Sequence, residues 1–266
     1  MIKNSSLIKI HNKESFEKMR LAGKLAADCL DHVTEFIKPG ISTLEINNIC
    51  HEFQVKNGAM PAPLNYKGFP MSICTSVNHV VCHGIPSNKI LSKGDILNID
   101  VTPILDGWHG DTSRMFYVGN VSIKAQKLVE TTYEAMMRGI EMIKPGNTVG
   151  DIGYAIQKFT EKKRYSVVRD FCGHGLGEVF HDYPSILHYG NSGEGEELKE
   201  GMFFTVEPMI NVGDFKIKVL SDGWTAVTSD KSLSAQFEHS VGVTKNGYEI
   251  FTKSSKKYNF PPYIIK

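Results

Sequence analysis

Residues 37–46 read IKPGISTLEI, and a similar stretch, IKPGNTVGDI, fills residues 143–152, displaced by 106 positions. Each copy follows a long stretch with a helical pattern, at residues 14–37 and 124–143. In both copies Pro-Gly then ends the helix. Because the helix and its stop occur together twice, the chain contains an internal repeat.

A capping signal follows each copy. Ser42 with Glu45, and Thr148 with Asp151, are spaced as the two partners of a capping box. These signals predict a second helix directly after the first in each half of the chain.

The repeat extends to strands that carry acids. KGDILNIDV matches EGMFFTVEP at an offset of 107, which puts Glu207 in the position of Asp100. DTSRMFYVGN, from Asp111, is matched more loosely by EHSVGVTKNG, from Glu238. We infer an α+β fold, internally duplicated, with antiparallel sheets, helices covering one face, and a pseudo-two-fold axis between the acids.

The first pair of acids lies on a predicted hairpin. Side chains alternate along the strand ILNIDVTP, so Asp100 and Thr102 share one face. Asp106-Gly107 is a strong signal for a two-residue turn. In that register Asp111 lies opposite Thr102, with Asp100 as its diagonal neighbour at about 7–8 Å. A carboxylate among apolar residues is costly to bury unless a cation neutralises it.

Composition excludes several classes of protein. The net charge of +1 in 266 residues gives no bulk field for nucleic acid or an anionic membrane. No signal peptide or membrane span is recognisable, and the five cysteines are scattered without CxxC spacing. These features predict the cytosol. The basic end, KSSKKYNFPPYIIK, is typical of a solvated tail.

Three histidines in glycine-rich or cleft-like contexts, His83, His174 and His181, accompany the four acids. Four carboxylates with one imidazole suit Mn²⁺, Fe²⁺, Co²⁺ or Zn²⁺ in a two-metal site and predict hydrolytic chemistry. Phosphate-binding GxxxxGK[ST], nucleophilic GxSxG and dinucleotide-binding GxGxxG patterns are absent from the sequence.

The motifs VCHGIP, NIDV with HGDTS, CGHGLG, FHDYP, FTVEP and AQFEH resemble those of bacterial type I methionine aminopeptidases, over essentially the whole chain. The resemblance implies the pita-bread fold in a single domain, 1–266, with pseudo-repeats at about 14–120 and 122–247. It implies a metallo-exopeptidase that removes the N-terminal methionine of nascent proteins and prefers a small second residue.

The resemblance also assigns ligands to two divalent ions. Asp100 and Asp111 would bind the first metal, with Asp111 bridging. His174 and Glu207 would bind the second metal, and Glu238 would bridge. A monovalent cation is implied at Asn78, Val80 and Ser234.

Catalytic and substrate-binding roles follow from the same resemblance. His83 would contact the scissile amide, His181 would bind the substrate carbonyl, and Glu207 would be the general base. The methionine side chain would enter a pocket lined by Tyr66, Phe69, Cys74, Phe180 and Trp224.

Two positions depart from the family pattern. Lys67 stands where many relatives have histidine, and Pro63 stands where many have cysteine. Lys67 either alters contact with the residue after methionine or is a solvated lysine. We expect Lys67→His to leave peptide hydrolysis within a few-fold.

The implied partner is the N-terminal peptide of a nascent polypeptide. The resemblance implies a monomer, and the basic tail would allow a transient contact with the ribosome. Two alternatives share the fold. Xaa-Pro aminopeptidases use a similar metal set but usually carry a sizeable N-terminal domain, whereas 99 residues precede Asp100 here. A binding protein that has lost catalysis normally loses ligands, and all five are present.

Overall fold

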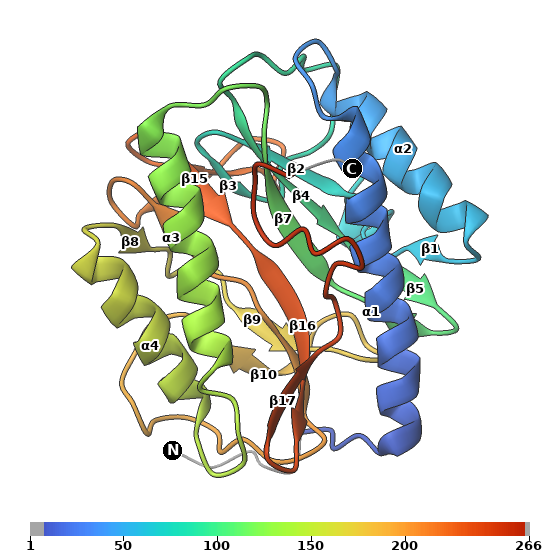
Figure 1. The fold of residues 1–266 in the computed structure, drawn as a ribbon, viewed down its shortest axis with the longest axis vertical. Coiled ribbons are helices and arrows are strands. Elements are labelled where there is room, and N and C mark those ends of the chain that lie inside the picture. The colour runs from blue at the N-terminus through green and yellow to red at the C-terminus, as the bar shows by residue number, and fades with distance from the viewer. Residues whose placement is uncertain (1–7, 264–266) are drawn as a thin grey trace.

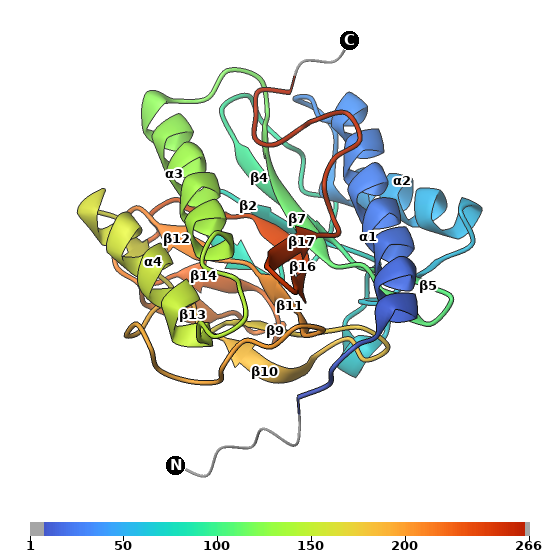
Figure 2. The ribbon, with the colours of Figure 1, turned by 60° about the horizontal axis from the view of Figure 1, so that its bottom comes forward.

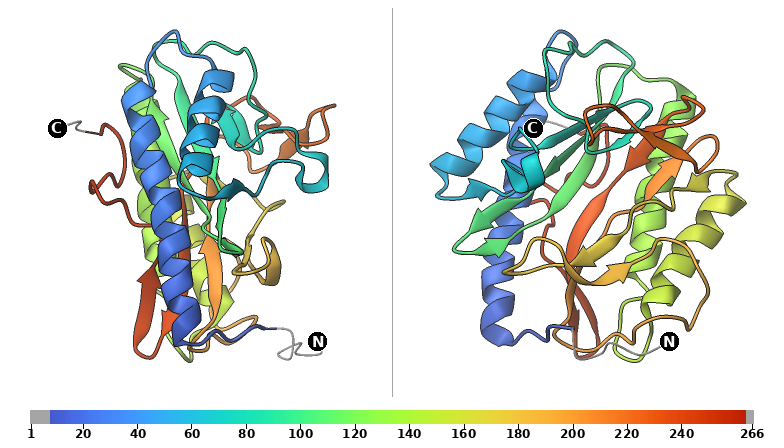
Figure 3. Two further views of the ribbon diagram at one scale, coloured as in Figure 1. Left: turned by 90° about the vertical axis from the view of Figure 1, so that its right-hand side faces the viewer. Right: turned by 180° about the vertical axis from the view of Figure 1, so that it is seen from behind.

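The computed structural model describes residues 8–263, and in this part of the chain the α-helices cover one face of a large sheet (Figures 1 and 3). The α-helices are α1 (Lys13–Val33), α2 (Thr43–Lys56), α3 (Ile123–Ile140) and α4 (Val149–Lys162). Short 3-10 turns are η2 (Thr34–Phe36) and η3 (Tyr66–Gly68). Among the described residues, none of the helices combines the length and apolar character needed to cross a membrane.

The large sheet is antiparallel, in the order β10-β9-β11-β16-β7-β4-β2, with β17 paired to β16. Its strands are β2 (Cys74–Val77), β4 (Ile96–Val101), β7 (Thr112–Tyr117), β9 (Gly173–Gly175), β10 (Asp182–Ile186), β11 (Phe203–Val206), β16 (Glu238–Thr244) and β17 (Gly247–Ile250). The two halves of the chain join where β7 pairs with β16.

Three small antiparallel sheets complete the described strands. The first holds β1 (Met60–Pro61), β5 (Pro103–Leu105) and β6 (Trp108–His109). The second holds β8 (Ser166–Val167), β12 (Met209–Asn211) and β15 (Ser234–Gln236). The third holds β3 (Val80–Cys82), β13 (Ile217–Val219) and β14 (Ala226–Thr228).

The duplication predicted from the sequence is confirmed in the order of elements: α1, α2, β4 and β7 in the first half recur as α3, α4, β11 and β16. Both predicted capping boxes form, from Ser42 with Glu45 and from Thr148 with Asp151.

The predicted hairpin register is also confirmed. Asp100 pairs with Ser113, and Ile104 pairs with His109, so one unbroken register runs from β4 and β7 into β5 and β6. This register sets Asp111 opposite Thr102, whose hydroxyl donates a 2.8 Å hydrogen bond to Asp111 Oδ1.

Strand alternation decides which face holds the acids. Leu97, Ile99 and Val101 of β4 are fully buried in a cluster with residues of α1 and α2. Asp100 therefore points to the opposite face, away from the helices. On β16, Val241 belongs to the core cluster beneath α3 and α4, which puts the even-numbered Glu238 on the face shared with Asp100.

The end of the chain differs from the predicted solvated tail. As far as Tyr263, it runs between α1 and α3 against the sheet (Figure 2). Ser254 donates hydrogen bonds to the buried Asp31 of α1, and Tyr263 donates to the Met115 carbonyl of β7. Tyr258 in this C-terminal segment is only 8% exposed, so the segment is part of the packed structure.

Candidate active site

A cavity of about 390 Å³ opens on the side of the sheet away from the helices. Its wall includes all five predicted metal ligands, both predicted substrate histidines and all five residues predicted for the methionine pocket. Its remaining lining residues are Pro63, Lys67, Cys82, Thr102, Asp170, Phe171, Cys172, Met209 and Gln236.

The acids of the two halves meet at the junction of β7 and β16. Asp111 lies directly before β7, and Glu238 begins β16. Ser240 accepts a hydrogen bond from the Asp111 N–H at 3.2 Å and donates one to its carbonyl at 2.6 Å. Thr112 donates to the Glu238 carbonyl at 2.7 Å. The backbones that carry the two acids are therefore fixed to each other.

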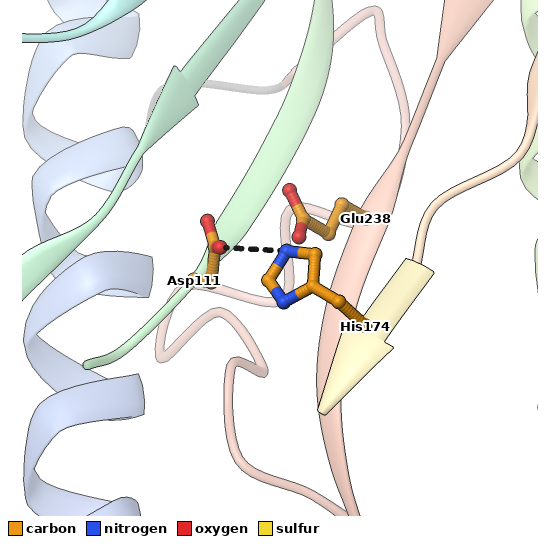
Figure 4. Close-up of side chains that lie close together, drawn as sticks. All are labelled: Asp111, His174 and Glu238. Carbon is orange, nitrogen blue, oxygen red and sulfur yellow. Dashed lines mark ion pairs between the residues drawn. The ribbon is translucent and has the colours of Figure 1, made fainter. Parts of the chain in front are cut away.

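His174 faces these acids from β9 (Figure 4). Its Nδ1–H donates to the Gly175 carbonyl at 3.1 Å, which leaves the lone pair of Nε2 free. Nε2 lies 3.7 Å from Asp111 Oδ2 and 3.6 Å from Glu207 Oε1. Ligand atoms of His174, Asp111 and Glu238 all lie within 4.8 Å of one another.

The glycines on either side of His174 have a packing reason. A Cβ on Gly173 would lie 2.3 Å from the Thr205 carbonyl oxygen, and one on Gly175 would lie 2.4 Å from that of Tyr183. The backbone of this segment is thus approached closely by neighbouring strands. This approach holds the His174 segment close against β11 and β10.

The electrostatics of the acids are those of a cation site. Burial raises the pKa of Asp111 to about 7 and, with the charges of neighbouring acids, raises the pKa values of Asp100, Glu207 and Glu238 well above their usual range. Burial also lowers the pKa of His174 to about 4, which keeps its imidazole neutral at pH 7. Neutral imidazole and ionised carboxylates are the forms that bind metal.

The donor set fits a divalent metal. The Nε2 lone pair of His174 faces carboxylate oxygens at a distance too long for a hydrogen bond. Within residues 8–263, Asp100 Oδ1 is buried and has no hydrogen-bond partner. A cation among these atoms would satisfy both groups.

The other predicted catalytic groups border the same cavity. Thr205 donates a 2.7 Å hydrogen bond to Glu207 Oε1, and Gln236 lies 3.3 Å from Glu207 Oε2. His181 Nδ1 lies 3.0 Å from Tyr66 Oη. His83 lines the same cavity and has a left-handed backbone, with φ of 55°.

The pocket residues make an aromatic and thiol wall. Phe69 and Trp224 pack edge to face at 5.2 Å, and Tyr66 packs against Phe180 at 5.0 Å. The Cys74 thiol is buried, and burial raises its pKa well above its usual range, so it stays neutral. Aromatic rings and a thiol are groups against which a thioether packs favourably.

Lys67 and Pro63 both line the cavity, so the departures from the family pattern lie at the site itself. Lys67 Nζ lies 5.2 Å from the centroid of the Tyr66 ring. Two of the three residues expected around a monovalent cation are in contact, because the Ser234 N–H donates to the Asn78 carbonyl at 2.9 Å. The third residue, Val80, is half-buried on β3. That cation remains a prediction.

Sequence reasoning missed the polar groups behind the ligands. Thr205 donates to Glu207 and accepts a 3.0 Å hydrogen bond from the His174 N–H, so one hydroxyl contacts two candidate ligands. Gln236 belongs to the AQFEH motif and Thr205 to the FTVEP motif, so the available signal for both was their place in a motif beside a predicted ligand.

Metallopeptidase family M24 matches the chain over residues 17–245. Methionine aminopeptidase of Rickettsia prowazekii is 64% identical over 258 residues, covering 96% of this chain and 99% of that protein. Methionine aminopeptidase A of Synechocystis sp. is 54% identical over 92% of this chain and 97% of its own length.

Solved structures agree with the sequence relatives. The crystal structure of the R. prowazekii methionine aminopeptidase superposes with a TM-score of 0.92 at 64% identity, covering 92% of this chain and all of that one. Prolidase from Pyrococcus horikoshii shares the fold alone, with a TM-score of 0.74 at 21% identity over 92% of this chain and 64% of its own. The duplicated sheet with its covering helices is the pita-bread fold, and the chain belongs to metallopeptidase family M24.

Proposed function

We propose that this chain removes the N-terminal methionine from new polypeptides by hydrolysing the first peptide bond. The observation that carries this proposal is a single cavity that unites an oxygen-rich ligand set with an aromatic, thiol-containing pocket. The relatives that are 64% and 54% identical are methionine aminopeptidases, which supports the same activity.

The family implies divalent metal, and we propose two ions per chain. Asp100 and Asp111 would hold one, His174 and Glu207 the other, with Asp111 and Glu238 between them. When bound, such ions lower the pKa of water and polarise a peptide carbonyl. Cobalt, manganese, iron and zinc are all compatible with these donors. A monovalent cation at Asn78, Val80 and Ser234 belongs to the same proposal.

Glu207 is the proposed general base. Its carboxylate accepts a proton from the attacking water and returns it to the departing amine. The hydrogen bonds from Thr205 to Oε1 and from Gln236 to Oε2 support this role, because they fix the orientation of the carboxylate in the cavity wall.

His181 is the proposed donor to the peptide carbonyl, and His83 the group beside the scissile amide. If the Tyr66 hydroxyl donates to His181 Nδ1, the ring proton stays on Nε2, where it can stabilise an oxyanion. Burial lowers the pKa of His83, so its imidazole is neutral near pH 7 and can accept a proton during the reaction.

The methionine side chain would lie against Phe69, Trp224 and Cys74, with sulfur–aromatic contacts of about 0.3–1.5 kcal/mol each. We propose a preference for a small second residue. We further propose a single domain of two repeats, at about 14–120 and 122–247, that acts as a cytosolic monomer. A transient ribosome contact through the basic residues after 252 is part of the same proposal.

The test is methionine release from Met-Ala-Ser, Met-Leu-Ser and Ala-Pro-Ser by anaerobically purified protein, with Mn²⁺, Fe²⁺ or Co²⁺ added in turn. Rapid release from Met-Ala-Ser alone supports the reaction and the small-residue preference. Cleavage of Ala-Pro-Ser instead would move the chain to the proline-specific relatives. Failure on all three peptides despite bound metal would favour a binding protein.

A further inference from the structure

The loop at residues 176–181, between β9 and β10, carries Phe180 and His181 and is tied to the first half of the chain at both ends. At its start, the Gly177 carbonyl accepts two hydrogen bonds of 2.9 Å, from the main-chain N–H and from Nδ1–H of His109. At its end, Tyr66 Oη contacts His181 Nδ1 at 3.0 Å. Because a carbonyl oxygen only accepts, Nδ1 of His109 must carry the proton.

The imidazole of His109 also supports the middle of this loop. Its ring stacks on Phe180, with centroids 5.5 Å apart and planes 9° from parallel. Phe180 in turn lies 4.0 Å from the His181 ring and 5.0 Å from the Tyr66 ring. His109 is only 8% exposed and does not line the cavity, so it can act on the cavity through these neighbours but not by direct contact.

The backbone at Gly177 is closely surrounded by side chains. Gly177 has φ of 152°, and a Cβ there would lie 3.1 Å from His11 Cε1 and 3.4 Å from Trp108 Cζ3. Without the His109 Nδ1–H bond and the ring stack, the start of the loop would keep the main-chain bond from His109, a 3.3 Å bond from the Leu176 N–H to the Phe203 carbonyl, and the exposed ion pair of Glu178 with Lys9. None of these contacts involves Phe180 or His181.

We propose that His109 is a positioning residue that fixes loop 176–181 so that Tyr66 can hold His181 toward the peptide carbonyl. This inference rests on the proposed function, because it assigns His109 a role through His181. Through His109, the hairpin that carries Asp111 contacts the loop that carries His181. The proposed metal ligand and the proposed carbonyl-binding histidine therefore keep fixed positions relative to each other.

A double-mutant cycle tests the proposal. In otherwise wild-type protein, His109→Phe keeps a stacking ring and loses the Nδ1 donor, and we expect kcat for Met-Ala-Ser to fall about ten-fold. His109→Ala loses both contacts and should lower kcat about 10- to 100-fold. In a His181→Ala background, either substitution should lower kcat by less than about two-fold, since the positioned group is gone.

Two further readouts separate positioning from general damage. Mn²⁺ affinity by isothermal titration should be unchanged in His109→Phe, which would exclude an effect through the nearby Asp111. Hydrogen–deuterium exchange of residues 176–181 should become faster in His109→Phe. The matched control is His51→Ala, which removes another histidine with an Nδ1 contact, at 2.8 Å to Ser72 Oγ, and should alter neither kcat nor this exchange.

Equal losses of kcat in both backgrounds, or no loss with either His109 variant, would overturn the proposal. Unchanged exchange in residues 176–181 would also overturn it, even if the double variants are too slow to assay. Wild-type protein that fails to release methionine from any peptide would instead defeat the proposed function, so the two failures are distinguishable.

Discussion

Four carboxyl groups and one neutral imidazole lie together in the wall of one cavity, where burial makes each acid unfavourable to ionise. Burial raises the pKa values of all four acids, so the folded chain resists their ionisation. At the scale of the residue, the site therefore lowers the stability of the metal-free protein and prepares it to bind cations.

With a chelator present, we expect Glu238→Gln to be more stable than wild type at pH 8 but not at pH 5. The folded-state pKa of Glu238 is raised well above 4.5, mainly by burial. Below pH 4.5 the group is protonated in both states and has no effect. As pH rises, the unfolded chain releases the proton first, so the wild type loses stability until pH exceeds the folded pKa. The gap in free energy of unfolding, from urea titration, should widen steadily from pH 5 to pH 8.

Saturating Mn²⁺ should reverse that order, because the wild type then gains the free energy of ion binding. Glu194→Gln, at an exposed position, serves as the control and should match wild type at both pH values. A difference between Glu238→Gln and wild type that is the same at pH 5 and pH 8 would show that the carboxyl does not titrate as described.

Thr205→Val should weaken Mn²⁺ binding about 10- to 100-fold, whereas Thr205→Ser should stay within a few-fold of wild type. The hydroxyl joins the His174 N–H to Glu207 Oε1, and valine has the same shape without it. Competition with a chelator of known affinity gives the dissociation constants. Equal affinities for the valine variant and wild type would remove Thr205 from the support of the site.

At the scale of the element, the sequence predicted the hairpin because its signals are local. Alternation put Asp100 and Thr102 on one face, and Asp106-Gly107 fixed the turn and hence the register. The pairings of β1 with β5 and of β8 with β12 were not predicted, because β1 and β8 are only two residues long and their partner strands are distant in the sequence. Thr205 was missed for a related reason: its partners are set by tertiary packing.

The packed end of the chain was missed because its lysines and serines have the composition of a solvated segment. In the structure, Ser254 and Arg114 both donate to Asp31, which is 3% exposed. One acid of α1 thus links a helix, a strand and the C-terminal segment, and charge composition alone does not reveal such a pairing.

Asp31→Ala should lower the free energy of unfolding by about 3–5 kcal/mol, since it leaves Arg114 buried without its counter-charge. Asp28→Ala, one turn earlier on α1, removes a pair with Lys24 nearer the surface and should cost less than about 1 kcal/mol. Both values come from urea unfolding in the same buffer. Similar losses for the two variants would contradict the assignment of Asp31 as a buried anchor.

At the scale of the whole molecule, the two repeats meet where β7 pairs with β16, and the acids lie at that junction. The duplication was predicted because helix, stop and acid strand recur in order. The relative placement of His174 and His181 could not be derived from pattern alone, since glycine-rich segments carry no periodicity.

Because the ligands come from both repeats, divalent metal should stabilise the fold as a unit. At a free concentration 100 times the dissociation constant, Mn²⁺ should add about 2.7 kcal/mol to the free energy of unfolding. A thermal melt should show one transition that moves to higher temperature with metal. Asp111→Ala should lose most of this shift, and an unchanged shift in that variant would place the metal elsewhere.

The most direct single measurement is methionine release from Met-Ala-Ser as Mn²⁺ is added stepwise to metal-free protein, for wild type and Glu238→Ala in parallel. We predict no release in chelator, a rise to a plateau as no more than two ions bind per chain, and no rise in Glu238→Ala. Release in the presence of chelator, or the same metal dependence in Glu238→Ala as in wild type, would contradict a metal centre built from the acids of both repeats.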